Sequence, residues 1–298
     1  MTQGLPLAMD APTTAAGEPT ISQGTDPVGD AVREGTISGR LWLYANYHCN
    51  LTCDYCLTES APNVPARELG ADRMRSLVEE AAGLGFSSLG VTGGEPFLLP
   101  YLPELVADLS QVLPVVVLTN GTLFTPHRLA RLAQWAELPI KLQISLDRPD
   151  PVANDSMRGP ENFRKVVDSV PRLIDKGIGV RIATTLEAVD PEELKRLCRL
   201  HRQLGVLDED HVVRPIVRRG RARLQGLGQH AGPVDLEPEL TITADGAFWS
   251  PFAPTVTGGR LDTDLLVTRQ IAPLRVPAEA MVRMARAWTR FQSGIRFR

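Results

Sequence analysis

The sequence predicts an α/β protein: a partial (β/α)6 barrel, similar in form to a TIM barrel, followed by a small C-terminal α+β extension. Three observations predict this fold. Short apolar runs alternate with helical stretches from Leu41 onward, the helical stretches carry apolar residues at three- and four-residue spacing, and the alternation stops near residue 220. Parallel strands joined by right-handed helical crossovers curve into an open or closed barrel, whose ligands bind at the carboxyl ends of the strands.

The predicted elements follow one another along the chain. Strands are expected at 41–47, 87–92, 114–119, 141–147, 179–185 and 211–217, with helices near 70–84, 101–111, 126–135, 161–175 and 191–203. Asp190 followed by Pro191 and two acidic residues is typical of a helix start. A hairpin around Asp245-Gly246 and a helix over about 278–291 predict a small domain of residues 221–298, after a barrel domain of residues 39–220.

The composition excludes several classes of protein. The chain has 298 residues, is 43% hydrophobic and carries a net charge of -3, so it can form a full core and lacks the basic excess of a general nucleic-acid binder. Residues 1–38 are acidic and show no hydrophobic period, which predicts a disordered tail. No apolar run reaches the roughly 18–20 residues of a membrane span, and no signal peptide is visible. We therefore expect a soluble, cytoplasmic protein without a membrane or nucleic-acid partner.

A cluster of cysteines follows the first predicted strand. Cys49, Cys53 and Cys56 lie within eight residues, in a chain with too few cysteines for a disulfide scaffold. Three thiolates on one loop can hold three irons of a [4Fe–4S] cluster and leave the fourth iron open for chemistry. The alternative is a four-coordinate zinc site completed by His48, although His48 adjoins Cys49 at a strand end, an awkward position for closing a tetrahedron. The ligand types suit either metal, and the iron–sulfur cluster is our prediction.

Polar motifs also end the next three strands. The second ends in Gly93-Gly94-Glu95-Pro96 and the third in Asn120-Gly121, and each alone is typical of an ordinary turn. Two glycines let the backbone approach a ligand closely, and the carboxylate of Glu95 can accept a hydrogen bond from an ammonium group. In the fourth strand, apolar Leu142, Ile144 and Leu146 alternate with polar Gln143, Ser145 and Asp147. In a barrel covered by helices, the polar face points inward and predicts a bound ligand.

Together these motifs resemble those of the radical S-adenosylmethionine (SAM) enzymes, over about Leu41 to Gly220. The matching features are the Cys-x3-Cys-x2-Cys loop with Tyr55 before its last cysteine, Gly-Gly-Glu-Pro, Asn-Gly and Ser-x-Asp, in that order. More narrowly, the chain resembles the branch that contains the molybdenum-cofactor cyclase and the sulfatase and peptide maturases. An Asp-Gly hairpin like that at Asp245 begins the cysteine-rich extension of the maturases, but Ser250 or Pro251 stands here where they have a cysteine.

The resemblance implies a set of cofactors and ligands. Cys49, Cys53 and Cys56 would be the catalytic and metal-ligating residues of one [4Fe–4S] cluster. Ser145 would contact the ribose of SAM with Asp147 nearby, and Arg158 resembles an arginine placed near the ribose and carboxylate of SAM, although alone it reads as a surface charge. The cofactor-binding residues expected from the resemblance are Tyr55, Gly93, Gly94, Glu95, Asn120, Ser145, Asp147, Arg158 and Arg214.

The resemblance also implies a reaction. One electron from the reduced cluster cleaves SAM into methionine and a 5′-deoxyadenosyl radical, which abstracts a hydrogen atom from the substrate. We expect a small biosynthetic metabolite as substrate. A maturase of ribosomal peptides is an alternative, disfavoured because no cysteine follows Cys198 to hold an auxiliary cluster and because residues 1–38 do not resemble a leader-binding domain. A non-catalytic metal- or cluster-binding scaffold is another alternative, which leaves the polar face of the fourth strand unexplained.

Five arginines crowd the end of the sixth strand: Arg214, Arg218, Arg219, Arg221 and Arg223. They could form a solvated basic turn, an anion site for the SAM carboxylate or an acidic substrate, or a docking patch for an acidic electron donor such as flavodoxin or ferredoxin. Arg214 lies within the strand and is the one expected to point inward.

Overall fold

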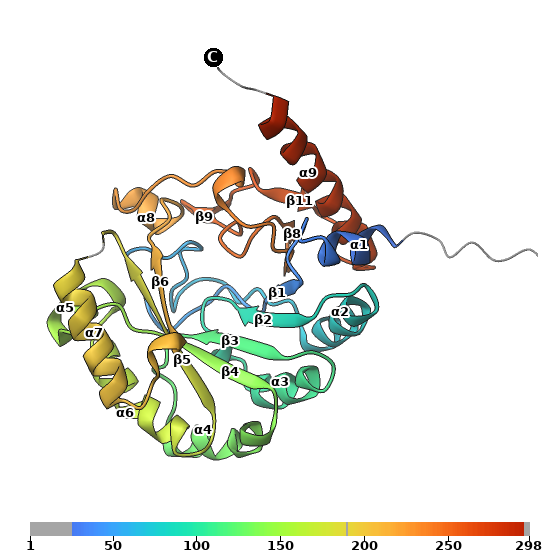
Figure 1. Cartoon of the computed structure of the whole chain (residues 1–298). Helices are drawn as coiled ribbons and strands as arrows, with labels where there is room; N and C mark the ends of the chain where they lie inside the picture. The colour runs from blue at the N-terminus through green and yellow to red at the C-terminus, as the bar shows by residue number, and fades with distance from the viewer. Residues whose placement is uncertain (1–25, 189, 295–298) are drawn as a thin grey trace, which may run out of the picture.

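A curved sheet of parallel strands forms the centre of the protein. The computed structural model describes residues 26–188 and 190–294 of the chain. Six strands are adjacent in both sequence and space, all parallel: β1 (Arg40–Tyr44), β2 (Ser88–Thr92), β3 (Val115–Thr119), β4 (Ile140–Ser145), β5 (Gly179–Leu186) and β6 (His211–Pro215). Each lies within a few residues of its predicted range, and the predicted α/β fold, a partial barrel, is confirmed (Figure 1).

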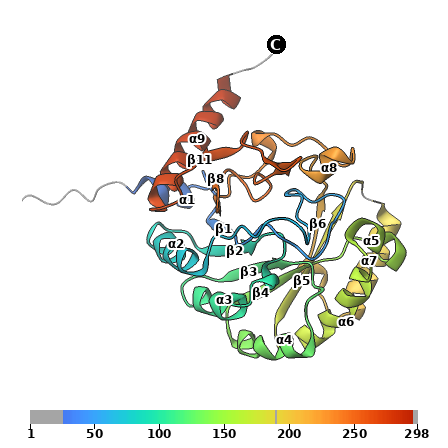
Figure 2. The ribbon, with the colours of Figure 1, turned by 180° about the vertical axis from the view of Figure 1, so that it is seen from behind.

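Helices cover the outer face of this sheet as an arc, which both ribbon views show (Figures 1 and 2). They are α2 (Ala71–Gly83), α3 (Leu102–Ser110), α4 (Pro126–Arg131), α5 (Pro151–Arg158), α6 (Asn162–Ile174) and α7 (Pro191–Gln203). Asp190 caps α7 as predicted, since its carboxylate accepts a hydrogen bond of 2.9 Å from the Glu192 N–H. The helix expected at 126–135 is divided into α4 and the 3₁₀ helix Ala133–Glu137. Helix α5 was not predicted, because it is short and mostly polar.

The alternation in β4 separates the core from the interior of the barrel. Leu142 and Ile144 are fully buried and belong to the hydrophobic core under the helices. Gln143 and Ser145 lie on the opposite face, and Ser145 lines a cavity inside the barrel. The polar face therefore points inward, as the alternation predicts.

The C-terminal extension continues the sheet of the barrel. Strand β7 (Thr241–Thr243) pairs in parallel with β1, and β8 (Gly246–Phe248) and β11 (Leu266–Thr268) follow as antiparallel neighbours, giving a nine-stranded sheet. The predicted Asp245-Gly246 hairpin is the turn between β7 and β8. Three strands of the extension are thus built onto the β1 edge, and only the β9–β10 hairpin forms a sheet of its own within the described residues.

The remaining elements of the extension lie above the sheet and at its edge. They are the short helix α8 (Arg221–Leu224), the hairpin of β9 (Val256–Thr257) and β10 (Arg260–Leu261), and the long helix α9 (Arg275–Gly294). Figures 1 and 2 place α8 and β9 on the side of the barrel that the arc of helices leaves open. No helix in the described ranges is both long enough and apolar enough to cross a lipid bilayer.

Part of the acidic N-terminal segment is folded. Of the predicted disordered tail, residues 1–25 lie outside the described residues. The prediction is wrong for residues 26–38, because helix α1 (Pro27–Arg33) buries Val28 and Ala31 in the core. Ion pairs of 3.6 Å between Asp26 and Arg275, and of 3.7 Å between Glu34 and Arg286, connect this segment to α9. The helix spans only seven residues, too few to produce a hydrophobic period in the sequence.

Candidate functional site

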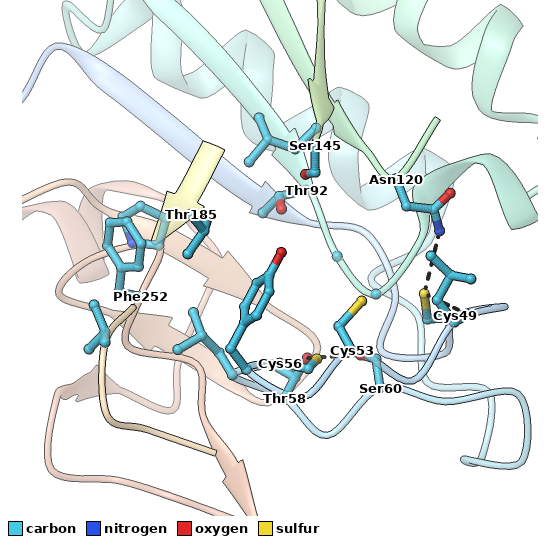
Figure 3. A pocket seen from close by; sticks show the side chains of 18 of the residues that line it. Cys49, Cys53, Cys56, Thr58, Ser60, Thr92, Asn120, Ser145, Thr185 and Phe252 are labelled. Atoms are coloured by element: carbon cyan, nitrogen blue, oxygen red, sulfur yellow. Dashed lines mark hydrogen bonds between the residues drawn. The ribbon is translucent and has the colours of Figure 1, made fainter. Parts of the chain in front are cut away.

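A cavity of about 220 Å³ lies inside the barrel at the carboxyl ends of the strands. Its walls come from the cysteine loop, from the ends of β1 to β6, and from Pro251 and Phe252 of the extension (Figure 3). The three clustered cysteines all line it. A parallel barrel binds its ligands at this end, because the connecting loops meet there.

The three thiols surround a volume and do not converge on a point. Cys49 Sγ accepts hydrogen bonds from the Leu51 N–H at 3.3 Å and from Asn120 Nδ2 at 3.7 Å. Cys53 Sγ lies 3.5 Å from the Arg158 carbonyl oxygen, and Cys56 Sγ lies 3.6 Å from Thr58 Oγ1. Within residues 26–188 and 190–294, no three His, Cys, Asp or Glu side chains are placed to hold a single metal ion.

The chemistry of the cysteines fits an iron–sulfur cluster. Burial raises the pKa of Cys49 to about 12 and that of Cys53 to about 11. Both thiols are therefore protonated at neutral pH until a metal displaces their protons. The amide donors that face Cys49 are of the kind that stabilises sulfur with thiolate character.

The alternative zinc ligand, His48, does not line the cavity. Its backbone carbonyl accepts a hydrogen bond of 3.0 Å from the Glu95 N–H, which ties the start of the cysteine loop to the end of β2. The main chain of His48 thus holds the cysteine loop against the end of β2. The geometry gives no support to a zinc site completed by the His48 ring.

Gly93 and Gly94 line the cavity, and neighbouring backbone also requires their small size. A Cβ atom on Gly93 would lie 2.4 Å from Asn46 Oδ1, and one on Gly94 would lie 2.2 Å from the His48 carbonyl oxygen. Both contacts are with the segment that leads into the cysteine loop. The glycines therefore let this loop pack tightly against the end of β2.

Glu95 does not line the cavity, in contrast to the simplest interpretation of the motif. Its carboxylate is fully buried and accepts hydrogen bonds from Phe97 N at 3.0 Å, Thr119 Oγ1 at 2.9 Å and Asn120 N at 2.7 Å. Burial raises its pKa from the ordinary value. Glu95 thus fixes the end of β3 and with it Asn120, whose side chain reaches Cys49 and lines the cavity.

Asp147 is also buried behind the cavity wall. One carboxylate oxygen accepts a hydrogen bond of 2.8 Å from the Thr185 N–H, and the other accepts hydrogen bonds from Tyr55 Oη and, at 3.0 Å, from Arg158. Arg158 also donates to Tyr55 Oη. Tyr55 and Arg158 line the cavity, whereas Asp147 holds both in place. Arg158 is 4% exposed, so the reading of this arginine as a solvated surface charge is wrong.

A chain of buried amides supports this group, and sequence reasoning missed it. Asn154 in α5 accepts a hydrogen bond of 3.1 Å from the Asp147 N–H and donates one of 2.9 Å to Asn162 at the start of α6. Asn162 in turn donates to the Asn120 carbonyl at 3.4 Å. The network connects the ends of β3 and β4. Its only sign in the sequence is a set of asparagines in a short polar segment, which alone predicts a loop.

Several residues that line the cavity were not predicted as site residues, and three of them are informative. Trp42 in β1, Thr185 in β5 and Phe252 in the extension all contribute to the walls. Thr185 could have been found as a polar residue at a strand's carboxyl end, while Phe252 comes from a segment without a regular pattern. In Figure 3, Cys49 and Asn120 lie at one side of the cavity, and Thr185 and Phe252 lie at the other.

The arginine group divides into residues with different roles. Arg214 lines the cavity, as expected from its position within β6. Arg221 donates hydrogen bonds to the carbonyl oxygens of Cys53 and Ser60, so it holds the cysteine loop. Arg219 is buried, donates to Asp264 at 2.8 Å and to Thr255 at 2.9 Å, and fastens the extension over that loop. These two arginines are not part of a solvated turn.

Comparisons with known proteins agree with this geometry. The Radical SAM superfamily profile matches residues 44–201. The chain is 32% identical over 161 residues to the AdoMet-dependent heme synthase of Methanosarcina barkeri. This alignment covers 53% of this chain and 46% of that protein. It is 30% identical over 161 residues to the mycofactocin maturase MftC of Mycobacterium tuberculosis, an alignment that covers 53% of this chain and 40% of that protein. The chain thus spans less than half the length of these curated relatives.

The fold is also found in solved structures. Native anSMEcpe with bound AdoMet (SAM) superposes with a TM-score of 0.59 at 13% identity, covering 83% of each chain. At this identity the likeness concerns the fold alone, and it extends beyond the barrel into the C-terminal part. The family match covers more than half of the chain, including the cysteine loop and the strand ends that enclose the cavity. The chain belongs to the radical SAM superfamily.

Proposed function

We propose that this protein holds one [4Fe–4S] cluster on Cys49, Cys53 and Cys56, and uses it to cleave SAM reductively and abstract a hydrogen atom from a small biosynthetic metabolite. The observation that carries this proposal is that all three cysteines of the loop line the same cavity as Gly93, Gly94, Asn120, Ser145 and Arg158. When bound, the cluster and SAM would supply the one-electron cleavage chemistry, and the electron would come from an external donor.

The chain's own residues would bind and orient SAM within the cavity. Cavity-lining Ser145 and Tyr55 present hydroxyl groups, Arg158 presents a cationic one, and the backbone of Gly93 and Gly94 forms part of the wall. Glu95 and Asp147 would act through these groups: Glu95 positions Asn120, and Asp147 positions Tyr55 and Arg158. Burial raises the pKa of Tyr55 well above its usual value, so its hydroxyl remains a neutral hydrogen-bond donor at neutral pH.

The size and lining of the cavity favour a small substrate over a peptide. Pro251 and Phe252 of the extension line the cavity, and Arg219 fastens the same extension to the barrel through Asp264. The cavity of about 220 Å³ would also hold the cofactors, so the space left beside SAM suits a compact molecule, and the covered part of the cavity would shield a reactive radical from water. Peptide maturation is the second candidate, supported by the similarity to MftC. For the electron donor we propose flavodoxin or ferredoxin, whose acidic surface would suit the exposed Arg223 beside the cysteine loop.

The proposal is tested by reconstituting the protein anaerobically and measuring iron, sulfide and the electron paramagnetic resonance spectrum of the reduced protein. We expect about four irons per chain and a spectrum that changes when SAM is added, since SAM would bind the open iron. Zinc without iron, or a cluster whose spectrum SAM leaves unchanged, would contradict the proposal. A peptide substrate would be indicated if hydrogen abstraction occurred only from a peptide.

A further inference from the structure

Two arginines on the inner face of the barrel have no ion pair with a carboxylate of the described residues. Nε of Arg214 is buried and has no hydrogen-bond partner in the described part of the chain, and the contact it makes is with the ring of Phe252, 5.9 Å from its guanidinium carbon. Nε of Arg181 is likewise buried and unpartnered. Arg214 pairs in register with Thr185, and Arg181 lies four residues before Thr185 on the same face of β5. Both therefore belong to one inner surface.

The acidic groups that act on the two arginines are already engaged. Asp210, which acts on Arg181, pairs with Lys141 at 2.6 Å. Asp147 accepts hydrogen bonds from Tyr55, Arg158 and Thr185, and Glu239 lies 4.0 Å from Arg40 and 3.4 Å from Ser38 Oγ. Burial first, and then the charge of Arg181, lowers the pKa of Arg214 from its ordinary value. A buried guanidinium next to a second cation and without an anion costs free energy, which a bound anion would offset.

Arg214 lies away from Cys49, on the side where a substrate has room. Its register partner Thr185 and its ring partner Phe252 are both at the side of the cavity opposite Cys49 and Asn120 (Figure 3). In the proposed function, the cysteine side holds the cluster and SAM. The other side, between β5, β6 and the extension, is left for the molecule that reacts.

Several apolar side chains line the same cavity as Arg214. Trp42 packs against Gly90 of β2, where a Cβ atom would come within 2.2 Å of its indole ring, so only glycine leaves room for this side chain. Phe252 and Ile216 form neighbouring walls. The subsite thus combines one unpartnered cation with aromatic and aliphatic surfaces, a combination that suits an organic acid with a hydrophobic body.

We propose that Arg214, with Arg181 behind it, forms an anion subsite for the substrate, which carries a carboxylate or phosphate group held there while its apolar part packs against Trp42 and Phe252. A guanidinium can bind either oxyanion through two parallel hydrogen bonds. This inference rests on the proposed function for its assignment of the cysteine side to SAM. It assigns the substrate to the class of organic acids.

The test compares matched ligands on the reconstituted protein, with and without SAM. The probes are benzoate, phenyl phosphate and benzamide, which share a ring and differ in charge, and their affinities are measured by ligand-observed NMR titration at fixed salt. We expect at least one of the two anions, benzoate or phenyl phosphate, to bind at least about tenfold more tightly than benzamide. The stronger anion identifies the group on the substrate. Equal affinities for all three probes in the wild-type protein would overturn the proposal without any variant.

Variants then distinguish binding of the substrate from binding of the cofactor. Arg214→Gln should remove the preference for anions and leave the dissociation constant of SAM within about twofold, while Arg214→Lys should retain part of the preference. Arg73→Gln, at an exposed arginine of α2 outside the cavity, is the matched control and should change neither. If Arg214→Gln abolishes SAM binding and benzoate competes with SAM, Arg214 binds the carboxylate of the cofactor and the proposal is wrong. If the wild type binds no SAM, the proposed function fails. The affinity of benzoate compared with that of benzamide still decides whether the anion subsite exists.

Discussion

At the scale of single residues, two buried carboxylates control a cavity that they do not line. Glu95 accepts hydrogen bonds from the nearby Phe97 N–H and from Thr119 and Asn120 at the end of β3. Asp147 accepts hydrogen bonds from Tyr55, Arg158 and Thr185. Each fixes a side chain that does face the cavity. Their positions at strand ends could be predicted from the sequence, but their roles could not, because most of the donors come from other strands and loops, 24 to 92 residues away.

The cysteine loop gives the most direct prediction at this scale. Cys53→Ala should abolish cluster binding and leave the barrel folded, because the side chain lies on a loop at the rim of the sheet. Iron content and visible absorption after reconstitution measure the first effect, and circular dichroism measures the second. Cys198→Ala is the control, since Cys198 lies in α7 beside His211, and it should bind about four irons like the wild type. A full iron content in the Cys53→Ala protein would contradict the ligand assignment.

The ion pair of Asp147 and Arg158 should be worth far more than a surface pair. Asp147→Asn leaves a buried arginine, 4% exposed, without its counter-charge and should lower the free energy of unfolding by about 3–5 kcal/mol. The comparison is Asp72→Asn, which removes the exposed pair with Arg75 and should cost less than about 1 kcal/mol. Urea denaturation measures both. Similar losses in the two variants would mean that Asp147 does not stabilise the site.

At the scale of elements, the contact of the cysteine loop with α8 depends on one glycine. Gly220 has a φ of +55°, and a Cβ atom there would lie 2.1 Å from the Leu57 carbonyl oxygen. Arg221, the next residue, donates to the Cys53 carbonyl. The start of α8 therefore positions the loop that carries the cysteines, a contact between segments more than 150 residues apart.

A pair of glycines tests this contact. Gly220→Ala should displace the loop and reduce both stability and iron binding. Gly226→Ala is the matched control, because Gly226 also has a positive φ, +70°, but a Cβ atom there meets nothing within 4 Å. The control should cost about 1–2 kcal/mol from backbone strain alone and bind iron normally. Equal iron contents in the two variants would show that the loop does not need this close approach.

The packing of α7 on β6 makes stability depend on pH. Burial lowers the pKa of His201 to about 3, and neither ring nitrogen has a hydrogen-bond partner within the described residues. The unfolded chain binds a proton near pH 6.5, whereas the folded protein does not, so stability is lost as the pH falls below about 6.5, by up to about 1.4 kcal/mol per pH unit.

Replacing this histidine should flatten the pH dependence. His201→Leu should reduce the loss of unfolding free energy between pH 6.5 and 5, while the slope due to His211, whose pKa burial also lowers, remains. His230→Gln, at an exposed position, should leave the pH dependence as in the wild type. Urea denaturation at several pH values measures the slopes. An unchanged slope in His201→Leu would show that the ring is hydrated in the folded protein.

At the scale of the whole molecule, local patterns predicted the barrel and missed how the ends of the chain join it. All six parallel strands follow from apolar runs, because a strand buried under helices must be apolar on its outer face. The pairing of β7 with β1 brings together residues some 200 positions apart and has no local signal. The same holds for α1 on α9, and for Phe252 in the cavity wall. The cysteine loop was found from spacing alone, whereas the groups that support it came only with the fold.

The central claim is that the three cysteines make the cavity a site of reductive SAM cleavage. The most direct measurement is the formation of 5′-deoxyadenosine from SAM by the reconstituted, dithionite-reduced protein, compared with the Cys49→Ala, Cys53→Ala and Cys56→Ala variants. We predict that the wild type forms 5′-deoxyadenosine and that each variant forms none. Formation at the wild-type rate in any of these variants would contradict the claim.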